Sequence, residues 1–136
     1  MKRLSIIYLT IILVYSMPVK GQRTLSDEPK QNEDTEKLAD ISLQEGKFEK
    51  ALLLYRNLLE TNPQSSNLNF LVGYCYLNTD YGQEQAIEYL KKAIELAPSN
   101  KNDLPLEAHY YLAKAYHQNN QYSLALEVLD DLLLKI

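Results

Sequence analysis

The stretch "LADISLQEGKFEKALLLYRNLLETNP", residues 38–63, decides the fold of this chain. Its apolar residues recur every three or four positions, which is the period of an amphipathic helix, and the polar "QEGK" separates two such helices. The pattern returns in "VGYCYLNTDYGQEQAIEYLKKAIELAP", residues 72–98, and in "LAKAYHQNNQYSLALEVLDDLLLKI", residues 112–136. The sequence therefore predicts three pairs of helices.

A small residue recurs at one position of each first helix and one of each second helix. These residues are Ala39, Gly73 and Ala113, followed by Ala51, Ala86 and Ala125. Two antiparallel helices approach closely only where small side chains meet, so we expect the crossings at these positions. Pro63 and Pro98 follow the first two pairs, since proline does not continue a helix.

The fold class expected is all-α, and no alternating strand pattern competes with the helical one. The helices are predicted at 34–45, 48–61, 67–78, 83–97, 105–118 and 121–135.

These pairs resemble the tetratricopeptide repeat, a helix–turn–helix unit of about 34 residues. The resemblance covers about 32–136 and implies a helix–turn–helix solenoid of three units, at 34–65, 66–100 and 106–136. It also implies a non-catalytic module that binds a protein or peptide and needs no cofactor. Three departures stand out: Thr35, Asn69 and His109 replace the usual tryptophan, the second unit has an extra residue near Tyr81, and "NKNDLP" lengthens the next loop.

The first 21 residues have the pattern of a secretory signal peptide. Lys2 and Arg3 precede a run without charges, and Val19 and Gly21 suit positions −3 and −1, which places cleavage before Gln22. The alternative is a membrane anchor, but the run is shorter than the roughly 20 apolar residues that a spanning helix needs. Residues 22–33 are polar and are expected to form a flexible leader.

Charge disfavours nucleic acid and anionic membranes as partners. The chain has 14 Lys and Arg against 18 Asp and Glu; without Lys2, Arg3 and Lys20 the count is 11 against 18, a formal charge of −7. Nucleic-acid binding draws on clustered Lys and Arg, whereas moderate acidity is also what solubility alone would require.

The sequence shows no converging catalytic groups and no metal-ligand spacing. His109 and His117 are eight residues apart, whereas histidines that share a metal on a helix usually stand three or four apart. Tyr116 and Tyr122 are expected to pack within the third pair. Cys75, within "LVGYCYL", is expected to be a small buried residue.

The resemblance places the first helices on the concave, partner-binding face of the solenoid. The residues expected there are Glu36, Asp40, Leu43, Phe70, Tyr74, Leu77, Tyr110, Lys114 and His117. Members of the family that bind chaperones clamp a carboxylate with Lys and Asn; Glu36 and Asp40 stand at those positions, so carboxylate capture is not expected. The alternative for Phe70 and Tyr110 is that they pack between units.

The last helix is apolar over much of its surface. Leu129, Leu133 and Ile136 are expected to form an exposed apolar surface that self-associates, in a two-fold homodimer, or docks on a partner.

The segments "NLNFLVGYCYLN", residues 67–78, and "PLEAHYYLAKAYHQNNQYSLAL", residues 105–126, are similar to the repeat region of one group of bacterial envelope proteins. In that group the repeats precede a propeller-like segment and a peptidoglycan-binding OmpA-like domain, and some members are linked to gliding and type IX secretion. With the signal pattern, this similarity implies a periplasmic or outer-membrane-associated interaction module. The alternatives are an N-terminal fragment of a longer OmpA-like protein and an enzyme accessory factor.

Overall fold

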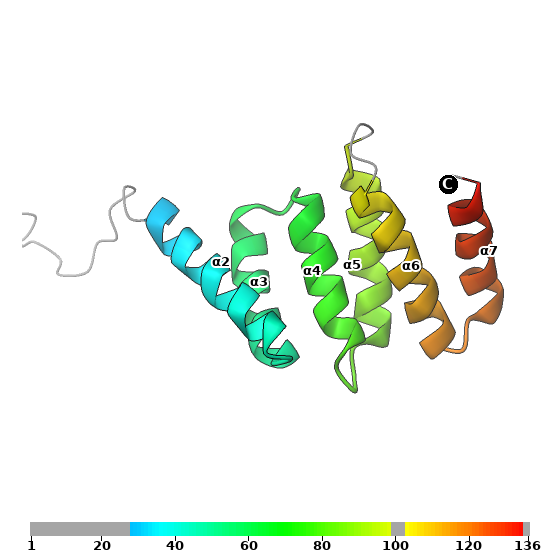
Figure 1. Ribbon diagram of the computed structural model, residues 1–136, viewed down its shortest axis with the longest axis horizontal. Helices are drawn as coiled ribbons and strands as arrows, with labels where there is room; N and C mark the ends of the chain where they lie inside the picture. The colour runs from blue at the N-terminus through cyan, green and yellow to red at the C-terminus, as the bar shows by residue number, and fades with distance from the viewer. Residues whose placement is uncertain (1–27, 99–102, 135–136) are drawn as a thin grey trace, which may run out of the picture.

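The computed structural model describes residues 28–98 and 103–134, and every regular element in these ranges is an α-helix. The helices stand side by side in chain order and form three successive antiparallel pairs (Figure 1). Their bounds are α2 Glu28–Gln44, α3 Phe48–Thr61, α4 Ser66–Leu77, α5 Gln83–Leu96, α6 Asp103–Gln118 and α7 Tyr122–Leu133. The predicted all-α solenoid is therefore confirmed.

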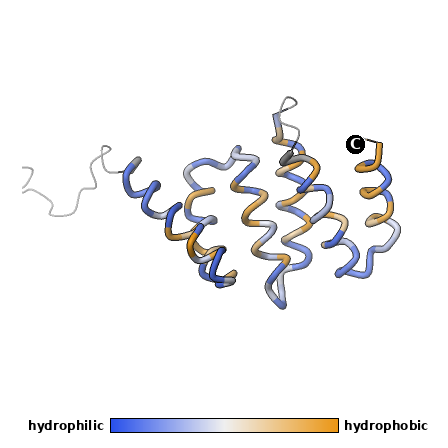
Figure 2. The backbone as a smooth tube through the Cα atoms, in the orientation of Figure 1, coloured by the Kyte–Doolittle hydropathy of each residue, from blue (hydrophilic) through white to orange (hydrophobic). Residues whose placement is uncertain are grey.

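The first helix is longer than the sequence predicted. It begins at Glu28, so residues 28–33 are helical and not part of a flexible leader. Two contacts across one helical turn support this extension: Lys37 pairs with Glu33 at 2.7 Å, and the Thr35 hydroxyl donates to the Gln31 carbonyl at 2.7 Å. Such contacts stabilise a helix that has no apolar face. The start of α2 is hydrophilic (Figure 2), so the hydrophobic pattern did not predict that these residues are helical. The expected signal peptide, 1–21, and residues 22–27 lie outside the described residues.

Helices of a pair cross at the small residues, as predicted. Ala39, Ala51, Ala86, Ala113 and Ala125 are all buried. In the second pair a Cβ added to Gly73 would lie 2.8 Å from Leu90 Cγ and 3.1 Å from the Leu90 backbone nitrogen. Glycine is needed there because α4 and α5 leave no room for a methyl group.

The turns of the first and third pairs share one backbone design. Gly46 has φ +71° and Asn120 has φ +59°, a left-handed conformation that glycine and asparagine tolerate best. The next residue closes the helix in both: the Lys47 amide donates to the Ser42 carbonyl, and the Gln121 amide donates to the Tyr116 carbonyl, each at 2.9 Å.

The entry to α4 is held by polar side chains. Ser65 caps the helix by accepting from the Leu68 amide at 3.2 Å. Asn69, which stands where the repeat usually has tryptophan, is fully buried and donates to the Ser65 carbonyl at 2.8 Å and the Pro63 carbonyl at 3.3 Å. An amide thus ties the loop between two units to the core at a position where the repeat normally uses aromatic packing.

The apolar core consists of two clusters, one at each junction between neighbouring pairs. The first includes Ala39, Ala51, Leu52, Tyr55, Leu58, Leu59, Val72 and Cys75. The second includes Phe70, Leu77, Ala86, Leu90, Ala93, Ala108, Leu112, Ala115, Tyr116 and Ala125. Leu71 and Tyr76 of α4 pack against both clusters. Each unit therefore buries its apolar face mainly against its neighbour, as expected for a solenoid.

One side-chain hydrogen bond joins the first two helices. The buried Tyr55 on α3 donates its hydroxyl to Asp40 Oδ1 on α2 at 2.6 Å. Burial, and then the Asp40 carboxylate, raise the pKa of the Tyr55 phenol, which keeps the hydroxyl protonated as a donor.

Replacement of Gly73 by alanine should destabilise the protein by about 1–3 kcal/mol, because the added methyl group overlaps Leu90. In an open helix the same change would be stabilising by ~1 kcal/mol. The sign of the change in the free energy of unfolding, measured with urea, therefore tests the crossing. Gly73→Ala combined with Leu90→Ala should cost less than the sum of the two single changes; strict additivity would contradict the contact.

Tyr55→Phe and Asp40→Asn should each lower the free energy of unfolding by about 1 kcal/mol, with a non-additive double variant. Because the folded pKa of Tyr55 lies above its ordinary value of 10.0, the phenol stabilises the fold below pH 10 and this contribution falls as pH rises further. Tyr55→Phe should therefore lessen the alkaline loss of stability. Glu60→Gln, which removes an exposed carboxylate from α3, the helix of Tyr55, is the matched control and should change stability little.

Candidate functional site

A continuous row of aromatic rings crosses the first helices of the second and third units. We call it the aromatic strip; its members are Phe48, Phe70, Tyr74, Tyr110 and Tyr111. The ring centroids of Tyr74 and Tyr111 are 4.9 Å apart at 82°, and those of Tyr110 and Tyr111 are 5.1 Å apart at 75°. Phe48 lies 6.2 Å from Tyr74 at the other end of the row. These edge-to-face arrangements are favourable for aromatic pairs, so the rings hold one another in place.

The strip is buried along one side and accessible along the other. Phe70 is buried and packs 5.9 Å from Tyr111 and 6.3 Å from Tyr74, whereas Tyr74 and Tyr111 are half-buried. Tyr110 is 54% exposed. Burial, more than the neighbouring Tyr74, raises the pKa of Tyr111, so this residue presents a neutral hydroxyl group at neutral pH.

Two expected partner-binding residues are inaccessible in the structure, and those expectations are corrected. Phe70 and Leu77 are buried in the core cluster that α4 forms with α6. Leu43 is half-buried and packs against the other cluster. Because α4 contacts α6 directly as well as α5, the third unit covers more of the first-helix face than the repeat pattern alone indicated. Phe70 therefore packs between units, which was the alternative for it.

An apolar cavity of about 400 Å³ lies between α6 and α7, and we call it the terminal groove. Its lining residues are Tyr110, Ala113, Lys114, His117, Tyr122, Ala125, Leu126 and Leu129. Four of these, Tyr110, Lys114, His117 and Leu129, were expected in binding surfaces, and the structure brings them to one place. Leu133 is exposed on the same helix as Leu129, and Ile136 lies outside the described residues.

Tyr122 is more exposed than expected, although its ring contacts His117 of the same helix pair. Its side chain is exposed, its hydroxyl donates to Asn120 Oδ1 at 2.8 Å, and its ring lies 5.3 Å from that of His117. Tyr116, in contrast, is buried as predicted. Tyr122 is one of the residues that line the terminal groove.

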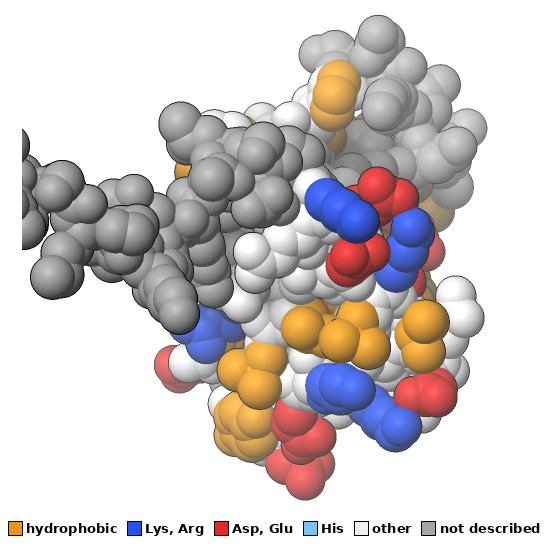
Figure 3. All heavy atoms as spheres, turned by 90° about the vertical axis from the view of Figure 1, so that its left-hand side faces the viewer, with side chains coloured by type: hydrophobic (Ala, Val, Ile, Leu, Met, Phe, Trp, Pro, Cys, Tyr) orange, Lys and Arg blue, Asp and Glu red, His pale blue; other side chains and the backbone are white. Residues whose placement is uncertain are grey.

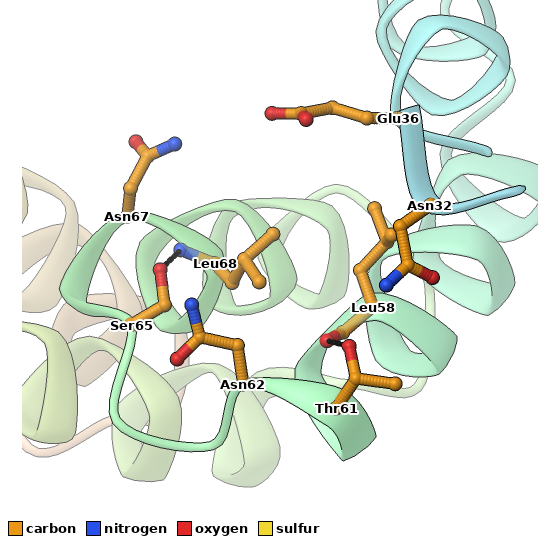
Figure 4. Close-up of a pocket in the computed structure, with 8 residues that line it drawn as sticks. All are labelled: Asn32, Glu36, Leu58, Thr61, Asn62, Ser65, Asn67 and Leu68. Atoms are coloured by element: carbon orange, nitrogen blue, oxygen red, sulfur yellow. Dashed lines mark hydrogen bonds between the residues drawn. The ribbon is translucent and has the colours of Figure 1, made fainter. Parts of the chain in front are cut away.

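The two expected acidic groove residues do not form a common site. Asp40 is the acceptor for Tyr55, as described above. Glu36 extends from α2 over a polar pocket of about 220 Å³, with Asn62, Ser65 and Asn67 on its other side (Figure 4). The pocket is lined by one carboxylate, that of Glu36, and by amide and hydroxyl groups. The first unit therefore presents hydrogen-bonding groups, whereas the third unit presents aromatic and apolar surface.

Cys75 and His109 lie in the packed interior of the molecule. Cys75 is fully buried as predicted, and burial raises the pKa of its thiol to about 12, which suppresses the nucleophilic thiolate. His109 is also buried, whereas His117 is exposed on the terminal groove. No group of three potential metal-ligating side chains occurs in the described part of the chain. Within the same ranges, 28–98 and 103–134, no helix has the length and apolarity needed to cross a membrane.

Sequence reasoning missed two members of the strip. Phe48 begins a second helix, and its contact with Tyr74 depends on how the α2–α3 turn places α3. Tyr111, which is half-buried against the second core cluster, is the ring that links Tyr74 to Tyr110 and was not among the residues expected on the binding face. The sequence feature that could have indicated this link is the run "HYY" at 109–111, because two consecutive tyrosines of a helix point in different directions.

Comparison with solved structures supports the same fold. A MamA RS-1 ArsTM double mutant matches with a TM-score of 0.69 and 19% identity, covering 82% of this chain and 59% of that one. MamA AMB-1 matches with a TM-score of 0.68 and 25% identity, covering 84% and 64% respectively.

Among curated proteins, the RNA polymerase-associated protein CTR9 of Saccharomyces cerevisiae is 24% identical over 71% of this chain, which corresponds to 10% of CTR9. The chain thus spans a tenth of that relative and less than two thirds of each MamA chain. The sequence profile of the tetratricopeptide repeat matches residues 36–101 and 84–135, most of the chain. With three helix pairs crossing at small residues, the chain belongs to the tetratricopeptide repeat family.

Proposed function

We propose that this protein is an exported interaction scaffold of the bacterial cell envelope that binds its protein partner through the aromatic strip. Proteins of this family generally act as non-catalytic scaffolds for protein–protein contacts. The observation on which the proposal rests is the accessible row Tyr74–Tyr111–Tyr110, with ring separations of 4.9 and 5.1 Å.

The physical argument concerns the entropy cost of binding. Tyrosine offers a large amphipathic contact area with few rotatable bonds, and rings already held edge to face lose little freedom when a partner covers them. The hydroxyl groups of the strip then supply hydrogen bonds at the rim of an apolar contact. A partner segment with apolar side chains and exposed backbone carbonyls fits this surface best.

The envelope location is supported by sequence patterns. The basic start, uncharged run and small residues before Gln22 are typical of export, and residues 67–78 and 105–126 are similar to the repeats of OmpA-like envelope proteins. A role beside an outer-membrane, secretion or gliding assembly is proposed on the same ground.

Photocrosslinking tests the strip directly. A photoreactive residue in place of Tyr110 should crosslink a partner in cells, whereas the same residue in place of Tyr81, which is exposed on the α4–α5 turn, should not. With that partner in hand, Tyr74→Ala should weaken binding by about 1–2 kcal/mol. Circular dichroism should show an unchanged helix content. Loss of stability with unchanged affinity would show that the strip serves only packing.

The mature protein should begin at Gln22. The mass of the protein recovered from the periplasmic fraction, checked by N-terminal sequencing, measures this directly. Recovery of the intact chain from the inner membrane would instead support the membrane-anchor alternative.

The alternative reading is that the chain is the N-terminal part of a longer OmpA-like protein. An adjoining downstream reading frame that encodes an OmpA-like domain would favour it. A catalytic activity of the purified protein would favour the enzyme-accessory alternative.

A further inference from the structure

We propose that copies of this chain associate head to tail, with α2 of one copy docking in the terminal groove between α6 and α7 of another. The contact would repeat the junction that already joins successive units within the chain. This inference does not depend on cellular location, and it shares one residue with the proposed partner surface, because Tyr110 belongs to the aromatic strip and also lines the terminal groove.

The second helices show what the terminal groove is missing. In each, three residues that follow the small residue by one, four and eight positions face the next unit. In the first unit these are Leu52, Tyr55 and Leu59, which are 5%, 0% and 8% exposed. In the second they are Ile87, Leu90 and Ile94, which belong to or pack against the core shared with α6. In the third they are Leu126, Leu129 and Leu133, which are 63%, 37% and 66% exposed.

The first helices show the complementary feature. Two residues, one before and two after the small residue, insert into the preceding unit. In α4 they are Val72 and Cys75, both 0% exposed, and in α6 they are Leu112 and Ala115, at 5% and 0%. In α2 the same positions are Leu38 and Ile41, which are 42% and 52% exposed.

The exposed residues of α2 and α7 therefore stand at the same positions, counted from the small residue of their helix, as the residues that are buried at the two internal junctions. Val72 and Cys75 share a cluster with Leu52, Tyr55 and Leu59, and Leu112 and Ala115 share one with Leu90. Among the described helices, α2 is the only first helix of a pair whose two docking positions are exposed. In the same way, α7 is the only second helix of a pair whose three docking positions are exposed. Hydrophobic side chains gather between charged ones on the α2 end of the molecule (Figure 3).

Size complementarity points the same way. The terminal groove has small residues, Ala113 and Ala125, at its centre and a volume of about 400 Å³. Leu38 and Ile41 are large side chains, and Ile41 stands where the internal junctions have Cys75 and Ala115. A second copy thus provides bulky groups for an apolar cavity, in the orientation that α4 and α6 already use.

The pairing is heterologous because the two faces are different surfaces. A contact of this type leaves one groove and one α2 face exposed at the ends of every assembly, so it extends into longer species unless the ring closes. A two-fold dimer through α7 alone would leave Leu38 and Ile41 exposed in both copies.

The proposal is tested by sedimentation velocity of the processed chain, purified from its own cells, at protein concentrations across the micromolar range. We expect species larger than a dimer as concentration rises. Ile41→Asp and Leu126→Glu should each weaken this association by at least about tenfold, because either change places a charge in the apolar contact. Leu53→Glu, which alters an exposed leucine outside both registers, is the matched control and should associate like the parent.

The decisive measurement mixes the two blocked variants. Ile41→Asp retains an intact groove and Leu126→Glu retains an intact α2 face, so an equimolar mixture should form a dimer that does not grow further. A two-fold dimer predicts a different outcome, in which Leu126→Glu alone abolishes association and the mixture does not restore it. That result, or a parent chain that stays monomeric, would overturn the proposal. Because every processed copy carries a net negative charge, with 11 Lys and Arg against 18 Asp and Glu once residues 1–21 are removed, added salt should strengthen the association.

Discussion

The close contact between Gly73 and Leu90 sets the spacing on which the rest of the structure depends. Only where a backbone without a side chain meets a leucine can α4 and α5 lie near enough for the faces of both helices to be covered by the neighbouring units. Buried alanines occupy the corresponding positions of the other pairs. Close pairs produce flat, regular units, and regular units can stack. The aromatic strip is a result of that stacking, since its rings come from helices of different units.

Local periodicity predicted the six helices and the buried small residues, because both depend on contacts within one pair. It failed where the outcome depends on the distance to another unit. Phe70 and Leu77 occupy the side of α4 that the repeat pattern assigns to the binding face, yet the direct approach of α6 buries them. Tyr122 shows the reverse. The repeat pattern predicts that it packs, but it is exposed, and no further described unit covers it. Asn69 and the extension of α2 to Glu28 depend on polar contacts, which hydrophobic patterns do not report.

The fold separates two kinds of surface by geometry. Side chains that face across the first helices, such as Tyr74 and Tyr110, are available to a partner lying along the array. Residues at its two ends, such as Ile41 and Leu126, are available to another unit of the same design. A partner and a second copy can therefore occupy the molecule at once, although Tyr110 also lines the terminal groove. Occupation of the groove would rigidify this tyrosine, which links binding on the strip to assembly at the ends.

The position of α4 between the two core clusters has a consequence for local opening. Leu71 and Tyr76 pack against both clusters, so unfolding of α4 would expose apolar surface in two places, whereas unfolding of α7 would expose it in one. In a linear array each segment is stabilised by its nearest neighbours alone, and its terminal segments fray first. Backbone amides of α4 should then exchange their hydrogens with solvent most slowly, with exchange becoming faster toward both ends of the chain. The end helices α2 and α7, which carry the faces proposed to meet another copy, are thus also those that open most readily, whereas Tyr74 of the aromatic strip lies on the helix that opens least readily.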